Sequence, residues 1–193
     1  MRFSAVLLAG GQSRRMGEDK ATILFRNVPL WKIQLDTLRK LRPQELLVSA
    51  QTDPPWRPAD VQFVADAQPS RGPLSGIVAA LSRINNDHLL VLAIDMPFMT
   101  PQYLRALMAR ARFGCGVVPM IANRADPLAA IYPRIALNEM SAALEGPDRS
   151  LQSVIQKLVT REKLLPIDVS DAEKTFFCNL NEPADLEHPV SNR

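Results

Sequence analysis

The chain has 193 residues, of which 47% are hydrophobic and 22% charged, and its formal net charge is +3. This composition is typical of a soluble globular protein, and no run of about 18 uninterrupted apolar residues predicts a membrane span. Aromatic residues make up only 6%, whereas a nucleic-acid surface needs aromatics interleaved with basic residues. We therefore expect neither a membrane nor a nucleic acid among the partners.

The length predicts a single domain covering residues 1–193. Cys115 and Cys178 lie far apart and lack the spacing of a metal site or a disulfide framework, so we expect reduced cysteines and a cytoplasmic location. The N-terminal apolar run is short and ends in Gly-Gly, which favours a first buried strand over a signal peptide.

The first part of the chain alternates apolar runs with helical periodicity. The run from Phe3 to Ala9 is nearly continuous, as expected of a central parallel strand covered on both faces. A helix is predicted from Pro29 until Pro43 ends it, because apolar residues recur there at steps of three and four. Further strands are predicted at 45–50, 61–65 and 88–94, and further helices at 74–84 and from Thr100 onward.

The second part of the chain continues the pattern less regularly. Strands are predicted at 116–121, 128–132 and 164–169, and helices at 135–144 and 151–159. Repeated alternation of strand and helix predicts an α/β fold with an open, mostly parallel, doubly wound sheet in three α/β/α layers. In such a sheet, ligands bind outside the carboxyl ends of the strands.

The first of these strand ends carries an unusual concentration of positive charge. The stretch LLAGGQSRRMGEDKA, residues 7–21, combines two glycines with Arg14, Arg15 and Lys20. Glycines let backbone N–H groups approach an anion closely, and the cations can neutralise several phosphate oxygens. Neither the Walker A pattern nor GxGxxG is present, so the stretch predicts a different phosphate-binding turn. Charge alone leaves a solvated turn with flexible arginines as an open alternative.

The second strand end of interest carries Asp95, directly after the apolar run HLLVLAI. A carboxylate costs much less at the mouth of the crevice than inside the core. Opposite a phosphate-binding turn, it predicts a divalent-cation site that bridges protein and phosphate. The alternative is that Asp95 caps the turn that follows.

The stretch LLAGGQSRRMGEDK resembles the signature LAGGxSxRMGxDK of the MobA-like molybdenum cofactor guanylyltransferases, which join GMP to molybdopterin. The resemblance continues, in the family's order, through GPLSG at 72–76, Asp-Met-Pro at 95–97, ADPLAAIY at 125–132 and NLNEPADL at 179–186. It covers nearly the whole chain. It implies a Rossmann-like nucleotidyltransferase fold, GTP as the donor, molybdopterin as the acceptor and Mg²⁺ as the cofactor.

The resemblance also implies roles for individual residues. Leu8, Ala9 and Gly10 would hold the guanine nucleotide, and Gly11 would let the chain pass close to phosphate. Arg15 and Lys20 would face the triphosphate, and Asp95 would bind magnesium. These last three are the candidate catalytic residues. Asp66 would lie near the nucleoside. Residues 1–112 would then form the nucleotide-binding half, and residues 113–190 the acceptor-binding half.

The resemblance assigns Gly76, Asn179 and Asn181 to the molybdopterin side. From the residues alone, the two asparagines could equally be turn residues before a last helix beginning at Pro183. One position departs from the family pattern: Gln51 stands where members can carry an asparagine that helps to read guanine. Glutamine offers the same amide one methylene further out.

The resulting hypothesis is transfer of GMP from GTP to molybdopterin with release of pyrophosphate. Within the enzyme class, the alternatives are a CTP-dependent enzyme for the same cofactor and a nucleotidyltransferase with a sugar-phosphate acceptor. Gly10-Gly11 favours the guanylyl enzyme, because cytidylyl relatives typically show LAAG at that point. A non-catalytic nucleotide-binding accessory protein is the alternative from another class. Other cofactor-biosynthesis proteins and acceptor molybdoenzymes are expected partners on family grounds.

Overall fold

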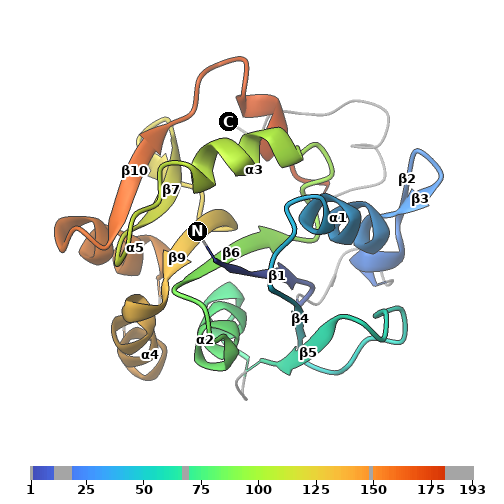
Figure 1. The fold of residues 1–193 in the computed structure, drawn as a ribbon, viewed down its shortest axis with the longest axis horizontal. Helices are drawn as coiled ribbons and strands as arrows, with labels where there is room; N and C mark the ends of the chain where they lie inside the picture. The colour runs from blue at the N-terminus through green and yellow to red at the C-terminus, as the bar shows by residue number, and fades with distance from the viewer. Residues whose placement is uncertain (1, 11–18, 67–69, 148–149, 181–193) are drawn as a thin grey trace.

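A computed structural model of the chain describes residues 2–10, 19–66, 70–147 and 150–180. These residues include an eight-stranded sheet with the order β10-β7-β9-β6-β1-β4-β5, in which β8 pairs with β7. Helices cover both faces of the sheet (Figure 1). The doubly wound α/β/α architecture expected from the alternation of strands and helices is confirmed.

The first four strands of the sheet are parallel and agree closely with the predicted ranges. They are β1 (Ser4–Leu8), β4 (Glu45–Ala50), β5 (Gln62–Ala65) and β6 (His88–Ala93). The chain runs outward from β1 to β4 and β5 and then crosses to β6 on the other side of β1. This reversal is a topological switch point, where open α/β sheets bind their ligands.

The later strands complete the sheet on the other side of β6. They are β7 (Gly116–Ile121), β8 (Arg124–Ala125), β9 (Ala129–Pro133) and β10 (Leu164–Asp168). β9 lies between β6 and β7 and is antiparallel to both, while β10 is parallel to β7. The predicted strands are present, and the reversed direction of β9 is a feature that periodicity does not reveal.

Within the described ranges, five α-helices form the outer layers. α1 (Leu30–Arg39) and α3 (Pro101–Met108) cover one face, and α2 (Pro73–Arg83), α4 (Leu137–Glu145) and α5 (Leu151–Thr160) cover the other (Figure 1). Thr100 caps α3 by accepting a hydrogen bond from the Tyr103 backbone N–H. The helix predicted at 135–144 begins as a 3-10 turn, η2 (Arg134–Ala136), before α4. Two more 3-10 turns are η1 (Lys20–Thr22) and η3 (Lys174–Phe177).

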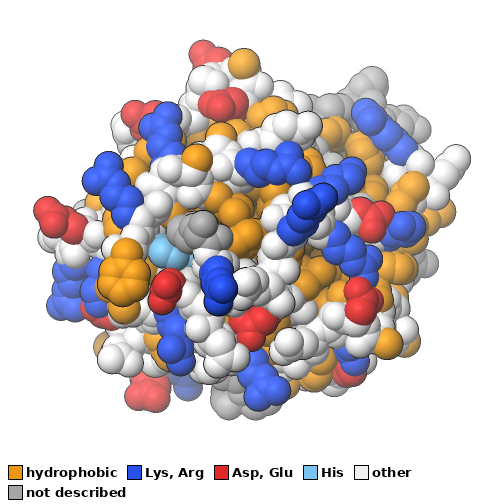
Figure 2. All heavy atoms as spheres, viewed as in Figure 1, with side chains coloured by type: hydrophobic (Ala, Val, Ile, Leu, Met, Phe, Trp, Pro, Cys, Tyr) orange, Lys and Arg blue, Asp and Glu red, His pale blue; other side chains and the backbone are white. Residues whose placement is uncertain are grey.

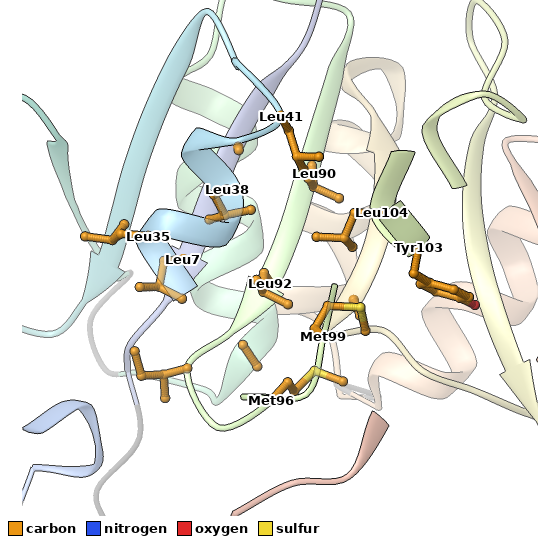
Figure 3. Close-up of a cluster of buried hydrophobic side chains, with 14 of the residues drawn as sticks. Leu7, Leu35, Leu38, Leu41, Leu90, Leu92, Met96, Met99, Tyr103 and Leu104 are labelled. Atoms are coloured by element: carbon orange, nitrogen blue, oxygen red, sulfur yellow. The ribbon is translucent and has the colours of Figure 1, made fainter. Parts of the chain in front are cut away.

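Alternate residues of the central strand β1 supply both halves of the core. Ala5 and Leu7 face the layer of α1 and α3, whereas Val6 and Leu8 face the layer of α2, α4 and α5. Figure 3 shows Leu7 packed among side chains of α1, β6 and α3. Burial on both faces explains why this strand is a continuous apolar run.

His88 begins β6 and has a structural role. Its side chain is buried, and its ring Nε2 lies 2.9 Å from the Arg112 carbonyl oxygen and 3.3 Å from that of Cys115. The imidazole therefore supports the tight turn between those residues. Both cysteines are free thiols.

Candidate active site

The carboxyl ends of the parallel strands meet at one edge of the sheet and are tied together by backbone hydrogen bonds. Ala9 N–H donates to the Ser49 carbonyl at 2.9 Å, and Ile94 N–H donates to the Leu8 carbonyl at 3.1 Å. Asp66 N–H donates to the Ala50 carbonyl at 2.9 Å. The residues that follow β1, β4, β5 and β6 are thus held side by side.

A cavity of about 200 Å³ opens at this edge, beyond the ends of β1 and β4. It is lined by Ala9, Gly10, Asp19, Ala50, Gln51, Thr52, Pro54, Pro55 and Trp56. Three residues selected from the sequence, Ala9, Gly10 and Gln51, are in this lining, and Leu8 is buried in the strand just before it. The structure therefore brings together the residues expected to hold the nucleoside and the amide expected to read its base.

Lys20 and Asp95 form an ion pair at the end of β6. Lys20 Nζ lies 3.2 Å from Asp95 Oδ2, and the two side chains are 21% and 19% exposed. Opposite charges at this separation attract more strongly where water is partly excluded than in bulk solvent. The two candidate catalytic residues that the structure describes are thus in direct contact.

Asp66 lies beneath Gly10, and the space between them is too small for another side chain. A Cβ atom at Gly10 would come within 2.6 Å of Asp66 Oδ2. The buried carboxyl accepts a hydrogen bond from Ser49 Oγ at 2.5 Å. Burial raises the pKa of Asp66, and the Ser49 hydrogen bond opposes that rise. Asp66 therefore contacts the predicted nucleotide-binding segment from below, and its role toward the nucleoside stays a prediction.

The two described residues assigned to the molybdopterin side occupy different places. Gly76 is buried in α2, where an added Cβ would lie 3.0 Å from Leu8 Cδ2 and 3.1 Å from Asp66 Oδ1. Asn179 lies next to Leu180, whose N–H donates to the Asp95 carbonyl at 2.9 Å. Asn179 Oδ1 is buried and has no hydrogen-bond partner among the described residues. Asn179 therefore lies near the segment that carries Asp95, whereas Gly76 packs beneath the nucleotide side.

Three of the predicted site residues, Gly11, Arg15 and Asn181, lie outside the described residues, as does Arg14. Their roles stay predictions.

Three further residues at the site were not identified from the sequence. Asp19 and Trp56 line the cavity and are hydrogen-bonded to each other. Burial raises the pKa of Asp126, and the negative charge of nearby Asp95 adds to that rise. Asp19 and Asp126 stand inside quoted motif blocks, GEDK and ADPLAAIY, which could have directed attention to them. No pattern in the sequence marks Trp56.

The donor set fits a magnesium ion of the kind that substrate phosphates help to bind. No group of three or more His, Cys, Asp or Glu side chains with metal-site geometry occurs in the described part of the chain. Mg²⁺ commonly uses one or two carboxylates together with substrate phosphates and water. Asp95 supplies one partly exposed carboxylate at the end of β6, and its chemistry fits a site of this kind.

On the face shown in Figure 2, basic side chains are interspersed with acidic ones. No helix within the described ranges has the length and apolar character needed to cross a membrane.

The sequence matches known proteins along most of its length. The model of the MobA-like NTP transferase domain family matches residues 5–163. A protein of Opitutus terrae named "Probable molybdenum cofactor guanylyltransferase" is 32% identical over 96% of this chain and 93% of that protein. A protein of Chloroflexus aggregans with the same name is 30% identical over 97% and 93%.

Solved structures show the same fold. Molybdopterin-guanine dinucleotide biosynthesis protein A from Archaeoglobus fulgidus superposes with a TM-score of 0.74 at 23% identity, covering 96% of both chains. The 4-diphosphocytidyl-2C-methyl-D-erythritol synthase of Anaerococcus prevotii superposes with a TM-score of 0.73 at 12% identity, covering 96% of this chain and 93% of that one. Both proteins therefore share the fold of this chain.

Proposed function

The chain belongs to the MobA-like NTP transferase family, and on that premise we propose that it transfers GMP from GTP to molybdopterin and releases pyrophosphate. The observation that carries the proposal is the Lys20–Asp95 ion pair, in which Lys20 directly follows the cavity-lining Asp19. Asp95 directly follows Ile94, whose N–H is bonded to the Leu8 carbonyl at the end of β1. The relatives named as guanylyltransferases support GTP as the donor and molybdopterin as the acceptor.

The cavity supports a nucleotide that lies across the ends of β4, β1 and β6. The base would enter beside Gln51, whose side-chain amide offers both a donor and an acceptor to a base edge. The backbone of Ala9 and Gly10 would pass under the ribose and phosphates. The triphosphate would then extend toward Lys20, which is positioned at the end of β6 by its contact with Asp95.

The chemistry requires charge neutralisation more than proton transfer. A phosphate monoester has a second pKa near 6. Most of the molybdopterin phosphate is therefore already a dianion at neutral pH. Its oxygen attacks the α-phosphorus of GTP, and the bond to the β-phosphate oxygen breaks as pyrophosphate leaves. Two anionic reactants repel each other, so the groups that matter are those that hold and neutralise phosphate oxygens.

Lys20 is the described cation best placed for this task. Its ammonium group can neutralise charge that develops on the departing pyrophosphate, and Arg15 is proposed to assist it. Asp95 is proposed to hold Mg²⁺, which, when bound, supplies charge neutralisation and orientation of the phosphate oxygens. Asn179 and Asn181, with residues 113–190 more broadly, are proposed to receive molybdopterin. Asn179 Oδ1, which is buried and has no hydrogen-bond partner among the described residues, supports a polar ligand on that side.

The test is a turnover assay with each donor separately. The protein is incubated with Mg²⁺, molybdopterin and GTP, CTP, ATP or UTP, and pyrophosphate and the dinucleotide product are measured. We expect turnover with GTP. Turnover with CTP instead would identify the cytidylyl alternative, and a protein that binds GTP without turnover would favour the accessory role.

Free thiols at Cys115 and Cys178 are compatible with action in the reducing cytoplasm.

A further inference from the structure

Trp56, which lines the cavity, contacts another lining residue, Asp19, and one residue of α1, Trp31. Its indole Nε1–H donates a 3.0 Å hydrogen bond to Asp19 Oδ2. Its ring stacks on Trp31 of α1, with centroids 5.7 Å apart and 14° between the planes. Trp31 is not among the cavity's lining residues, so it supports Trp56 from behind.

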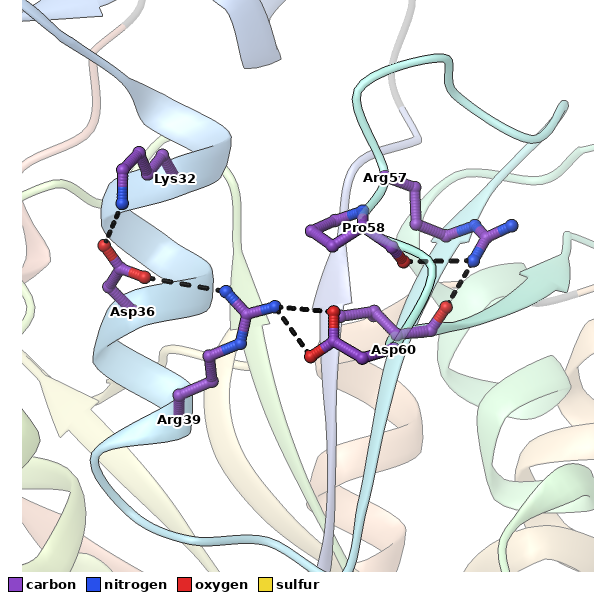
Figure 4. A network of polar contacts seen from close by, with 7 residues as sticks. Lys32, Asp36, Arg39, Arg57, Pro58 and Asp60 are labelled. Atoms are coloured by element: carbon purple, nitrogen blue, oxygen red, sulfur yellow. Dashed lines mark hydrogen bonds and ion pairs between the residues drawn. The ribbon is translucent and has the colours of Figure 1, made fainter.

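Two ion pairs brace the loop that carries Trp56, one within the loop and one to α1. Arg57 binds both carboxylate oxygens of Asp53, each at 2.7 Å, and Arg39 of α1 binds both oxygens of Asp60 at 3.0 and 2.9 Å. Figure 4 shows Arg39 linking α1 to this loop. These contacts favour the loop conformation that brings Trp56 to the cavity, and a favoured conformation lowers the entropy cost of binding.

Asp19 connects Trp56 to Lys20. One oxygen of its carboxylate, Oδ2, accepts from Trp56, and the other, Oδ1, accepts from the Ala21 backbone N–H at 3.0 Å and so caps η1. Lys20 is the first residue of η1 and pairs with Asp95. A single carboxylate thus joins the cavity wall to the short helix that positions the lysine.

We propose that Trp56 is a positioning residue, which acts through Asp19 to hold Lys20 toward the phosphate end of the nucleotide. This inference rests on the proposed function, because it takes the cavity as the nucleoside site. The indole N–H is the group that matters: without it, Asp19 and η1 lose one of their anchors, and Lys20 samples more positions. The stacked ring contributes the cavity wall and does not depend on the N–H.

The effect should depend on the number of phosphates. GTP has the β- and γ-phosphates that Lys20 would bind, whereas GMP lacks them. Loss of one hydrogen bond of this kind corresponds to a change of about 3- to 10-fold in affinity. Trp56→Phe keeps an aromatic wall and removes the N–H, so it should weaken GTP binding by that factor and change GMP binding less than twofold.

The experiment measures dissociation constants for GTP and GMP by titration calorimetry with Mg²⁺ present. The variants are Trp56→Phe, its matched control Trp31→Phe, Lys20→Ala, and the double variant Trp56→Phe/Lys20→Ala. Thermal unfolding of each variant verifies that it is folded. Trp31→Phe should preserve the GMP-to-GTP ratio of dissociation constants. Trp56→Phe should lower that ratio relative to the wild type. The double variant Trp56→Phe/Lys20→Ala should have the same ratio as Lys20→Ala.

Equal weakening of GTP and GMP in Trp56→Phe would overturn the inference, because Trp56 would then act as a wall alone. A ratio lowered as much by Trp31→Phe would also overturn it. Since these measurements need no acceptor, they are separate from the turnover assay. If the binding ratios are as expected but the wild type shows no turnover, the proposed function is contradicted and the inference about Trp56 stands. If the wild type turns over but Trp56→Phe leaves the binding ratio unchanged, the inference is overturned and the proposed function stands. If CTP is the donor, CTP and CMP replace the guanine nucleotides.

Discussion

Lys20 Nζ and Asp95 Oδ2 lie 3.2 Å apart, although 75 positions separate the two residues in the sequence. The contact joins the segment that follows β1 to the end of β6, across the switch point of the sheet. Under the proposed function, this contact would give a cation to the triphosphate and a carboxylate to its metal ion. Binding of a nucleotide would let Lys20 exchange Asp95 for phosphate oxygens.

Removal of either member of this pair should reduce turnover far more than stability. We expect Lys20→Ala and Asp95→Asn each to lower kcat about 10²- to 10³-fold, the loss typical when one preorganised stabilising group is removed. The free energy of unfolding should change by about 1 kcal/mol or less, because both side chains are partly exposed. Steady-state kinetics and urea unfolding measure the two effects.

A matched control is Lys32→Ala, which removes the 2.8 Å pair with Asp36 on the surface of α1. It should leave kcat within twofold of the wild type. Turnover that survives in Lys20→Ala or Asp95→Asn would show that the roles assigned to these residues are wrong.

Gly10→Ala should be destabilising because the new methyl group meets the Asp66 carboxylate at 2.6 Å. We expect a loss of about 1 to 3 kcal/mol in the free energy of unfolding, because Gly10 is exposed but the carboxylate that its new methyl group meets is buried and has little room to move. The double variant Gly10→Ala/Asp66→Ala should lose less than the sum of its single variants, since the clash is then absent. Urea unfolding of all four proteins gives this cycle, and strict additivity would contradict the contact.

Asp66 should make stability depend on pH. Burial raises the pKa of its carboxyl in the folded state, so the folded chain holds that proton more tightly than the unfolded chain. The contribution of Asp66 to the free energy of unfolding is fully present below the ordinary aspartate pKa. It is lost as pH rises through the raised pKa of the folded state. Between these two pKa values, the free energy of unfolding of the wild type should therefore fall relative to that of Asp66→Asn as pH rises. Urea unfolding from mildly acidic to neutral pH measures the difference, and a difference that stays constant would show that the two states bind the proton equally.

Gln51 should contribute to the choice of base rather than to the chemical step. Its exposed side chain lines the cavity, so Gln51→Ala should reduce the preference for GTP over CTP in kcat/KM by about 2- to 10-fold, the value of one hydrogen bond. Gln62→Ala changes an exposed glutamine of β5 outside the cavity lining and is the matched control. An unchanged preference in Gln51→Ala would assign base selection to other groups.

Most of the fold could be predicted because its strands and helices follow their own periodicities. The strands β4 and β7 begin and end at the predicted residues, since both are apolar runs between polar turns. Two hairpins of the described residues were missed, one formed by β2 (Leu24–Phe25) and β3 (Val28–Pro29), and the other by β7 and β8. Their two-residue loops, Arg26-Asn27 and Ala122-Asn123, adopt positive φ without any glycine, so the usual turn signal is missing.

The candidate site could be predicted only where its residues stand in contiguous motifs. Lys20 and Asp95 each follow a recognisable strand end, and the switch point of a doubly wound sheet brings such ends together. The contact between Trp56 and Asp19 could not be predicted, because it depends on how a proline-rich loop folds over the cavity. The place of Gly76 beneath Asp66 also depends on packing between α2 and the sheet, which spacing along the chain does not encode.

The antiparallel strand β9 also has a consequence for biosynthesis. β1, β4, β5 and β6 are complete once residue 93 has been synthesised, but the outer edge of β6 stays open until Ala129–Pro133 emerges from the ribosome. A nascent chain halted between these points would expose an apolar strand with unpaired backbone groups, the kind of edge that promotes aggregation. Chaperone dependence during translation should therefore be greatest in this interval.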